Sequence, residues 1–358
     1  MASMDIPRLR LFHQRIANTG FKDPVDVVRW LGAIQAQDYS AAKWAVGLRC
    51  SQTTDTALEE AFSRGDILRT HVMRPTWHFV LPEDIHWMLA LTAPRVKRAM
   101  SQYYRQLELD AAQLRRSNAS LTRALQGGKQ LTRLELRTHL QRSGINTDGL
   151  RFSFFVMHAE LERLICSGAR RGKQFTYTLL DERAPRVKTL ERDEALARLA
   201  QCYFSSRGPA TLKDYQWWSG LSPADAKEGL ELVKSKLTCE TMDEQTYWFA
   251  PSTPMAKHRS PSLFLLPNYD EYIVGYTDRS AIFDASHTEK LDARANPLFQ
   301  HTIVLYGSIV GTWKRTIKKD SVVLTQSLFR PLSKAEGRAV SIAAERYGKF
   351  VGLPAKLE

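Results

Sequence analysis

The segment Gly208-Pro-Ala-Thr-Leu-Lys-Asp-Tyr-Gln-Trp-Trp-Ser-Gly-Leu-Ser-Pro223 carries the start and stop signals of two consecutive helices. Thr211, with Asp214 three residues later, can cap the first helix, and Gly220 can end it. Ser222-Pro223 supplies a cap and a first-turn proline for the second helix. We therefore expect a short helix, a tight turn and a second helix in this part of the chain.

The residues before and after this segment complete a recurring plan. Residues 192–204 have apolar side chains at helical spacing, and residues 237–249 have the pattern of a β-hairpin with Asp243-Glu244 near its tip. Three helices followed by a hairpin are typical of a winged helix-turn-helix, which is a common way to present a helix to DNA.

Two earlier segments of the chain have the same plan. In the middle segment, residues 132–135 form a capping box, residues 154–166 are expected as the third helix, and residues 174–179 as a strand. In the first segment, Asp23-Pro24 starts a helix, and residues 67–80 are expected as a hairpin. These repeats predict the fold class α+β, with tandem winged helix-turn-helix units.

The C-terminal part of the chain changes character. Short strands separated by turns are expected at residues 262–267, 272–276, 302–306, 308–313 and 321–324. They predict a small antiparallel β domain or barrel, with a final helix over residues 334–347. The predicted domains are three winged helices and this β domain, at residues 1–115, 116–185, 186–255 and 256–358.

The charge of the chain indicates a polyanionic partner. The 358 residues carry a formal net charge of +13, and the basic residues gather in clusters separated by acidic and apolar segments. Such a surface attracts DNA, RNA or acidic membranes, although a basic enzyme with no such partner would have the same composition. Basic clusters at turns and strand tips favour contacts that follow a phosphate backbone.

Other features of the sequence favour a cytoplasmic protein. No run reaches the roughly 18 apolar residues that span a membrane, and the first ten residues lack the apolar core of a signal peptide. The four cysteines lie far apart without paired spacing, so we expect buried thiols and neither disulfides nor a zinc site. A monomer is the simplest expectation.

Most familiar catalytic motifs are absent from the sequence. It contains no dinucleotide fingerprint, phosphate loop, zinc-protease helix or serine elbow, so no cofactor and no metal is implied. His71 and His78 are expected to make structural hydrogen bonds. Asp270-Glu271 is a carboxylate pair, which we interpret as a surface acidic turn in preference to a general acid/base pair.

The motif Gln35-Ala36-Gln37 lies where a helical pattern breaks off. In an extended segment, side chains two residues apart point to the same side, so both amides can aim at one point. An amide accepts and donates hydrogen bonds but is no useful base, so the pair can position a water without strongly activating it. Such a site suits a substrate with a good leaving group. Asp38 could act as a base, but it would point away from an extended motif.

Several segments together resemble the winged-helix DNA glycosylases of the AlkZ and YcaQ type. These segments are the two-glutamine motif at residues 35–37 and four later stretches, at residues 69–71, 73–78, 265–272 and 310–315. The resemblance implies tandem winged helices in a curved, DNA-embracing arrangement closed by a C-terminal β domain. It also implies excision of N-alkylated purines by a monofunctional enzyme, including the unhooking of interstrand cross-links.

The resemblance places the catalytic motif on Gln35 and Gln37. An N7-alkylated guanine is cationic and leaves readily, through a transition state with oxocarbenium character. We therefore expect one amide, that of Gln37, to hold the attacking water and the other to orient that water or the sugar, with the assignment of the two roles left open. A shallow site is expected, because a cross-linked base stays tied to the other strand.

The expected partner is double-stranded DNA that contains alkylated purines or cross-links, bound in the nucleoid. The candidate DNA-binding residues are Arg69, His71, Arg74, Arg170, Arg171, Lys173, Lys314 and Arg315. Two alternatives stay open on the sequence. One is a winged-helix transcriptional regulator without catalysis, and the other is an unrelated hydrolase that uses Asp270 and Glu271.

Overall fold

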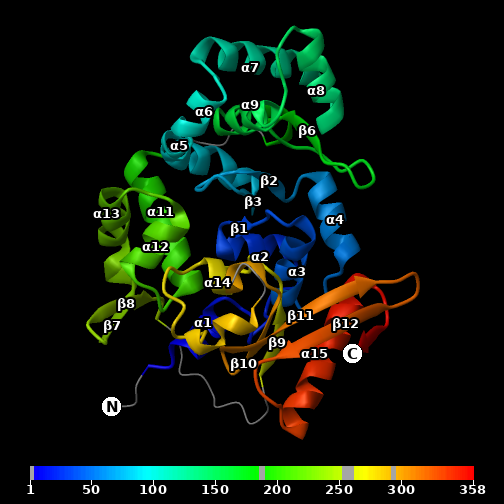
Figure 1. Cartoon of the computed structure of the whole chain (residues 1–358). Coiled ribbons are helices and arrows are strands. Elements are labelled where there is room, and N and C mark those ends of the chain that lie inside the picture. Colours follow the sequence, from blue (N-terminus) through cyan, green and yellow to red (C-terminus); the bar gives the residue numbers. More distant parts are fainter. Residues whose placement is uncertain (1–3, 185–189, 252–261, 292–295) are drawn as a thin grey trace.

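The computed structural model describes residues 4–184, 190–251, 262–291 and 296–358, and it confirms the α+β fold class. Figure 1 shows the small sheet that carries β1, β2 and β3 in the middle of the molecule. The helices α7, α8 and α9 lie above this sheet, the helices α11, α12 and α13 lie to its left, and the C-terminal sheet lies below it.

The first unit builds the central sheet. It comprises α1 (Ile6–His13), α2 (Pro24–Leu31), β1 (Ile34–Gln35), α3 (Tyr39–Arg49), α4 (Asp55–Arg64), β2 (Leu68–His71) and β3 (Trp77–Val80). Asp23 caps α2 and Pro24 is its first residue, as predicted. The expected hairpin is confirmed as β2 and β3, and β1 adds to it in the order β1-β3-β2.

The helices α5 (Pro82–Ala99) and α6 (Ser101–Gln106) connect the first unit to the second. The second unit comprises α7 (Ala111–Leu125), β4 (Leu131–Thr132), α8 (Arg133–Arg142), α9 (Arg151–Leu161), β5 (Ile165–Ser167), β6 (Thr176–Leu179) and α10 (Leu180–Arg183). The predicted capping box of Thr132 and Glu135 is confirmed. The predicted helix over residues 154–166 is wrong at its end, because Arg163 has a φ of 59° and the chain continues as β5.

The third unit confirms the reading of the segment from Gly208 to Pro223. It comprises α11 (Arg192–Arg207), α12 (Leu212–Ser219), α13 (Pro223–Val233), η1 (Lys234–Lys236), β7 (Thr238–Met242) and β8 (Gln245–Phe249). Thr211 and Asp214 form the capping box of α12, and Ser222 caps α13. Gly220 ends α12 with a φ of 68°, where a Cβ would lie 2.2 Å from the carbonyl oxygen of Met73. That close approach brings α12 against the turn between β2 and β3.

The C-terminal part is a five-stranded sheet covered by one long helix. It comprises β9 (Leu263–Leu266), α14 (Glu271–Val274), η2 (Ala285–Lys290), η3 (Pro297–Phe299), β10 (Thr302–Leu305), β11 (Ser308–Ile317), β12 (Val322–Leu328), α15 (Lys334–Val351) and β13 (Ala355–Leu357). The strand order β13-β12-β11-β10-β9 makes an open sheet within the described residues. It is not purely antiparallel, because β13 pairs with β12 in parallel.

The strand predicted at residues 272–276 is wrong. The side chain of Asp270 accepts a hydrogen bond from the backbone N–H of Tyr272 at 2.8 Å, which caps the short helix α14 in its place. Within this helix all four side chains, from Glu271 to Val274, are buried. A short run of apolar residues is compatible with either a buried helix or a buried strand. Here the cap formed by Asp270 favours the helix.

Among the residues that the structure describes, the hydrophobic core forms two clusters. One joins the second and third units through α5, and the other joins the first unit to the C-terminal sheet and α15. In the second cluster, Trp44 packs against Tyr347 and Phe350 with ring centroids 5.0 Å apart in each case, and its indole donates to the carbonyl oxygen of Leu265. The first unit and the C-terminal sheet therefore share a core. No helix within the described residues is long and apolar enough to cross a membrane.

Candidate active site

The two-glutamine motif begins in the edge strand of the central sheet, β1, which ends at Gln35. Gln35 pairs with His78 of β3, and the backbone N–H of Ala36 donates to the carbonyl oxygen of Trp77 at 2.7 Å. Ile34 and Ala36 both pack in the core, which leaves the side chain of Gln35 to the other side of β1, and Gln37 follows in a bend. Gln35 is 8% exposed, whereas Gln37 is exposed to solvent. The two amides therefore differ in how firmly they are held.

The amide of Gln35 is held by Arg74. The Nη2 of Arg74, in the turn between β2 and β3, donates to the Oε1 of Gln35 at 3.1 Å. The guanidinium of Arg74 also lies 5.7 Å from the ring centroid of Trp217 on α12, and burial lowers its pKa from the ordinary arginine value. For Gln37 the corresponding contact is long, because the backbone N–H of Trp77 donates to its Oε1 at 3.4 Å. Gln35 is the anchored amide of the pair.

Asp38, the carboxylate next to the motif, is occupied as the cap of α3. Its Oδ1 accepts hydrogen bonds from the backbone N–H of Ala41 and from the hydroxyl of Ser40, both at 3.0 Å. Burial raises its pKa, but these hydrogen bonds and the charge of Arg315 outweigh that effect and leave the pKa below its ordinary value. The carboxylate therefore stays ionised and engaged with the start of a helix.

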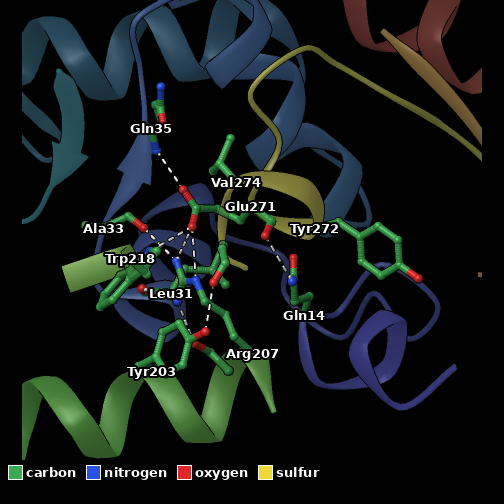
Figure 2. A network of polar contacts seen from close by, with 12 residues as sticks. Gln14, Leu31, Ala33, Gln35, Tyr203, Arg207, Trp218, Glu271, Tyr272 and Val274 are labelled. Carbon is green, nitrogen blue, oxygen red and sulfur yellow. Dashed lines mark hydrogen bonds and ion pairs between the residues drawn. The ribbon is translucent and has the colours of Figure 1, made fainter. Parts of the chain in front are cut away.

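The backbone of Gln35 is held by Glu271, which reaches the motif from the C-terminal part of the chain (Figure 2). The Oε1 of Glu271 accepts a hydrogen bond from the backbone N–H of Gln35 at 2.8 Å. Its Oε2 accepts from Arg207 at 2.7 and 3.0 Å and from the indole of Trp218 at 3.0 Å. In Figure 2 the side chain of Gln35 points away from this network, so only its main chain is engaged there.

Asp270 and Glu271 are therefore not a surface acidic turn, and that interpretation of the sequence was wrong. Both side chains are 0% exposed, and each forms an ion pair with a different buried arginine, Arg49 for Asp270 and Arg207 for Glu271. A signal for this was present in α11, where Arg207 continues the apolar stripe of Leu196, Leu199 and Tyr203. A charged residue in a buried stripe requires a buried partner.

Arg69 and His71, two of the candidate DNA contacts, lie inside the protein. Arg69 is 5% exposed, its Nε donates to the carbonyl oxygen of Ala36 at 3.0 Å, and burial lowers its pKa to about 10. Its guanidinium lies 4.3 Å from the ring centroid of Trp77 and 4.5 Å from that of Phe175. The ring of His71 lies 4.3 Å from that of the same Trp77, tilted by 43°, and His71 is hydrogen-bonded to the buried Glu160. These residues support the motif from within.

The basic residues between β5 and β6 differ in their partners. Arg170 forms an ion pair with Glu59 at 3.3 Å, and Arg171 forms one with Glu135 at 2.8 Å. Lys173 is exposed, and no ion pair to it is found among the described residues. A cavity of about 410 Å³ extends from Lys173 to the central sheet, lined by Arg69, Trp77, Arg133, Leu134, Lys173, Gln174, Phe175 and Tyr177. Its lining combines cationic and aromatic side chains and contains no carboxylate.

The two basic candidates on β11 lie on the other side of the motif. The Nη2 of Arg315 donates to the hydroxyl of Ser40 at 2.7 Å, next to Asp38, and Lys314 is exposed. The structure thus gathers Gln35, Gln37, Arg74 and Arg315 about one end of the central sheet. Within the described parts of the chain, no group of three or more His, Cys, Asp or Glu side chains is arranged to hold a metal ion.

Comparisons with known proteins identify the family and the fold of the chain. A family model described as "DNA glycosylase AlkZ-like" matches residues 28–350. The chain is similar to a Streptomyces sahachiroi protein named "Interstrand DNA cross-link repair glycosylase", with 26% identity over 317 residues that cover 81% of each sequence. The fold is similar to that of the solved structure of Streptomyces sahachiroi DNA glycosylase AlkZ, with a TM-score of 0.80, 20% sequence identity and 100% coverage of both chains.

Proposed function

The chain belongs to the AlkZ-like DNA glycosylase family, and from this premise we propose that it hydrolyses the N-glycosidic bond of cationic N7-alkylated purines in double-stranded DNA. Gln35 and Gln37 position the attacking water. The curated relative is named for interstrand cross-link repair, and we extend the proposal to the unhooking of such cross-links. The enzyme acts as a monomer and uses no cofactor.

The single observation that carries the mechanism is the state of the two carboxylates that adjoin the motif. Asp38 caps α3 through hydrogen bonds at 3.0 Å, and Glu271 is fully buried in an ion pair with Arg207. The lowered pKa of Asp38 makes it a weak base, and the burial of Glu271 keeps that carboxylate from a water in solvent. Water at this site is therefore positioned by amides and only weakly activated. A base that has become cationic supplies the remaining driving force as a good leaving group.

The two glutamines take different roles in this proposal. The exposed amide of Gln37 holds the attacking water, because its oxygen has only one long contact, at 3.4 Å, within the described residues. The amide of Gln35 is fixed by Arg74 and orients that water or the sugar. A fixed donor and acceptor costs no reorganisation when charge develops on the sugar.

We further propose that the three helical units are winged helices that present the motif to DNA. In the second and third units a pair of strands follows the last helix, β5 with β6 and β7 with β8. The proposed domains are residues 1–115, 116–185, 186–255 and 256–358. The exposed residues Lys173 and Lys314, together with Arg315, contact phosphates on either side of the motif. Exposure of Gln37, two residues beyond the edge strand β1, favours access to a base that cannot be fully extruded.

Single-turnover base release from a duplex that contains one N7-methylguanine tests this function. Abasic sites should form at a rate that falls by at least about 100-fold in Gln35→Ala/Gln37→Ala. DNA affinity should remain that of the wild-type protein, since neither glutamine carries charge. A cross-linked duplex, tested in parallel, reports whether unhooking occurs. Wild-type rates in the double variant would refute the catalytic assignment, and binding without any base release would favour a regulator.

A further inference from the structure

Glu271 and Arg207 hold the two ends of the segment that carries Gln35. We propose that this buried ion pair is a clamp that positions Gln35 for base release, so that Glu271 and Arg207 are positioning residues of the active site. The inference rests on the proposed catalytic function of Gln35. It gives a role to Glu271, which the reaction itself does not use.

The contacts of the ion pair fall on both sides of one short turn. From α11, the guanidinium of Arg207 donates to the carbonyl oxygens of Leu31 and Ala33, both at 2.8 Å. The same guanidinium donates to Glu271, whose other carboxylate oxygen accepts from the backbone N–H of Gln35. The chain from the end of α2 to β1 is thus held at three backbone groups by one ion pair (Figure 2).

The position of β1 in the sheet explains why an external acceptor is needed. β1 is an edge strand, and its next residue, Ala36, turns its N–H inward to Trp77 of β3. Alternate N–H groups of an edge strand point outward, so that of Gln35 finds no partner in the sheet. Glu271 supplies a charge-assisted hydrogen bond to this group, which is shorter and stronger than a neutral one. Without it, the backbone beneath the catalytic amide would be unpaired.

The clamp is rigid because its own members are fixed. Both side chains are 0% exposed, and the indole of Trp218 donates to Glu271 while its ring lies 4.3 Å from the guanidinium of Arg207. The adjacent Trp217 on α12 lies beside Arg74, which holds the Gln35 side chain. One helix of the third unit therefore supports both the backbone and the side-chain contacts of Gln35. Displacement of a positioned group by about 1 Å can lower a rate by about 100-fold.

The neighbouring pair Asp270–Arg49 provides a matched control. It is equally buried, and its two hydrogen bonds measure 2.8 Å each. Arg49 also donates to the carbonyl oxygens of Ala45 and Gln14, and neither partner contacts residues 31–35. Asparagine keeps an acceptor for the cap of α14, so Asp270→Asn removes a buried charge of the same kind without releasing Gln35.

The experiment is single-turnover base release from N7-methylguanine duplex at saturating protein, with DNA affinity and melting temperature measured on each variant. We expect Glu271→Gln to slow base release by about 10-fold or more at unchanged DNA affinity. Asp270→Asn should lower the melting temperature to a similar extent and keep the rate within about 2-fold of wild type. In Glu271→Gln/Gln35→Ala the rate should equal that of Gln35→Ala, because the clamp acts through Gln35.

If Glu271→Gln does not fold, Trp218→Phe replaces it in the experiment. This variant removes one hydrogen bond to Glu271 and keeps an aromatic ring against the guanidinium of Arg207. It should slow base release by about 3-fold, again without further effect in the Gln35→Ala background. The clamp would be overturned if the rate losses of the two single variants multiplied in either double variant. It would also be overturned if Asp270→Asn slowed base release as much as Glu271→Gln, and Glu271 and Arg207 would then have only a structural role. A wild-type rate in Gln35→Ala alone would instead defeat the proposed function of that glutamine, and the clamp with it.

Discussion

Arg74 donates a hydrogen bond to the side-chain oxygen of Gln35 across 3.1 Å, so a cation from the turn between β2 and β3 sets the orientation of the anchored amide. The amide oxygen is thereby directed to Arg74, and the NH2 group is available to a water or to the sugar. This contact separates the two glutamines chemically, because Gln37 has no charged partner among the described residues.

The first prediction concerns this contact. Arg74→Ala should slow base release by about 10-fold, because an amide without its anchor samples other rotamers and is aligned for only part of the time. Arg74→Lys should recover part of the rate, since it keeps the charge but lacks the planar fork. Single-turnover rates on N7-methylguanine duplex decide this. Equal rates in the alanine variant and the wild type would show that the anchor has no part in catalysis.

The second prediction tests Asp38 as a general base. Because its pKa is lowered and its Oδ1 caps α3, Asp38→Asn should change the rate of base release by less than about 3-fold. The variant should lose about 0.5 to 1 kcal/mol of stability or less, since asparagine is also a good cap. The stability provided by the ionised carboxylate is present above its unfolded-state pKa and is lost as the pH falls through the folded-state pKa. A rate loss of 100-fold at unchanged folding would make Asp38 the base.

The third prediction compares two cations of the β5–β6 connection. Lys173→Ala should lower the slope of log affinity against log salt by about 0.9, because an exposed unpaired cation releases a counterion when it meets a phosphate. Arg171→Ala should lower it less, since Glu135 already neutralises that guanidinium at 2.8 Å. The slopes come from binding to undamaged duplex over a series of salt concentrations. Identical slopes for Lys173→Ala and wild type would place the DNA elsewhere.

The fourth prediction is a loss of stability in mild acid. Burial, with a smaller effect from the charge of Arg315, lowers the pKa of His301 to about 4, and its Nδ1 accepts a hydrogen bond from the backbone N–H of Asn268 at 3.0 Å. The unfolded chain binds this proton near pH 6.5 and the folded chain does not, so stability falls as the pH decreases from about 6.5 to 4. His301 contributes on the order of 2 to 3 kcal/mol to this fall.

Thermal unfolding at pH 7 and pH 5 measures the effect, with His301→Gln as the comparison. The glutamine oxygen can accept the same hydrogen bond and does not titrate, so the variant should lose less stability between the two pH values. A variant with the same pH dependence as wild type would assign the effect to other buried histidines. His13, His78 and His158 also have pKa values lowered by burial.

Local signals in the sequence predicted the elements well and their long-range contacts poorly. The caps at Thr132, Thr211 and Ser222 predicted helix starts that the structure confirms, because capping depends on residues three positions apart. The buried pairs Asp270–Arg49 and Glu271–Arg207 join residues 221 and 64 positions apart. No local pattern contains such a pairing, and an acidic dipeptide is more often exposed.

The same limit applies to single aromatic and basic residues near the site. Trp313 is a buried support, 2% exposed, and its indole donates to the carbonyl oxygen of Leu266. Trp77 is only half-buried, because it lies at the end of β3 between Arg69 and His71. Sequence clusters of arginine indicated a charged surface, but which arginines are buried depends on aromatic partners from other units.

The last prediction concerns Gly220, where α12 meets the turn that carries Arg74. Gly220→Ala should lower the free energy of unfolding by about 2 to 4 kcal/mol, since a side chain is strained at its φ of 68° and the new Cβ would lie 2.2 Å from the Met73 carbonyl oxygen. Relief of that clash moves the Met73–Arg74 turn away from α12, so base release at a temperature where the variant is folded should also slow. Gly352→Ala is the control, because its φ of 73° is similar but nothing lies within 4 Å of the added Cβ. If Gly220→Ala loses no more stability and no more rate than Gly352→Ala, α12 does not set the position of Arg74.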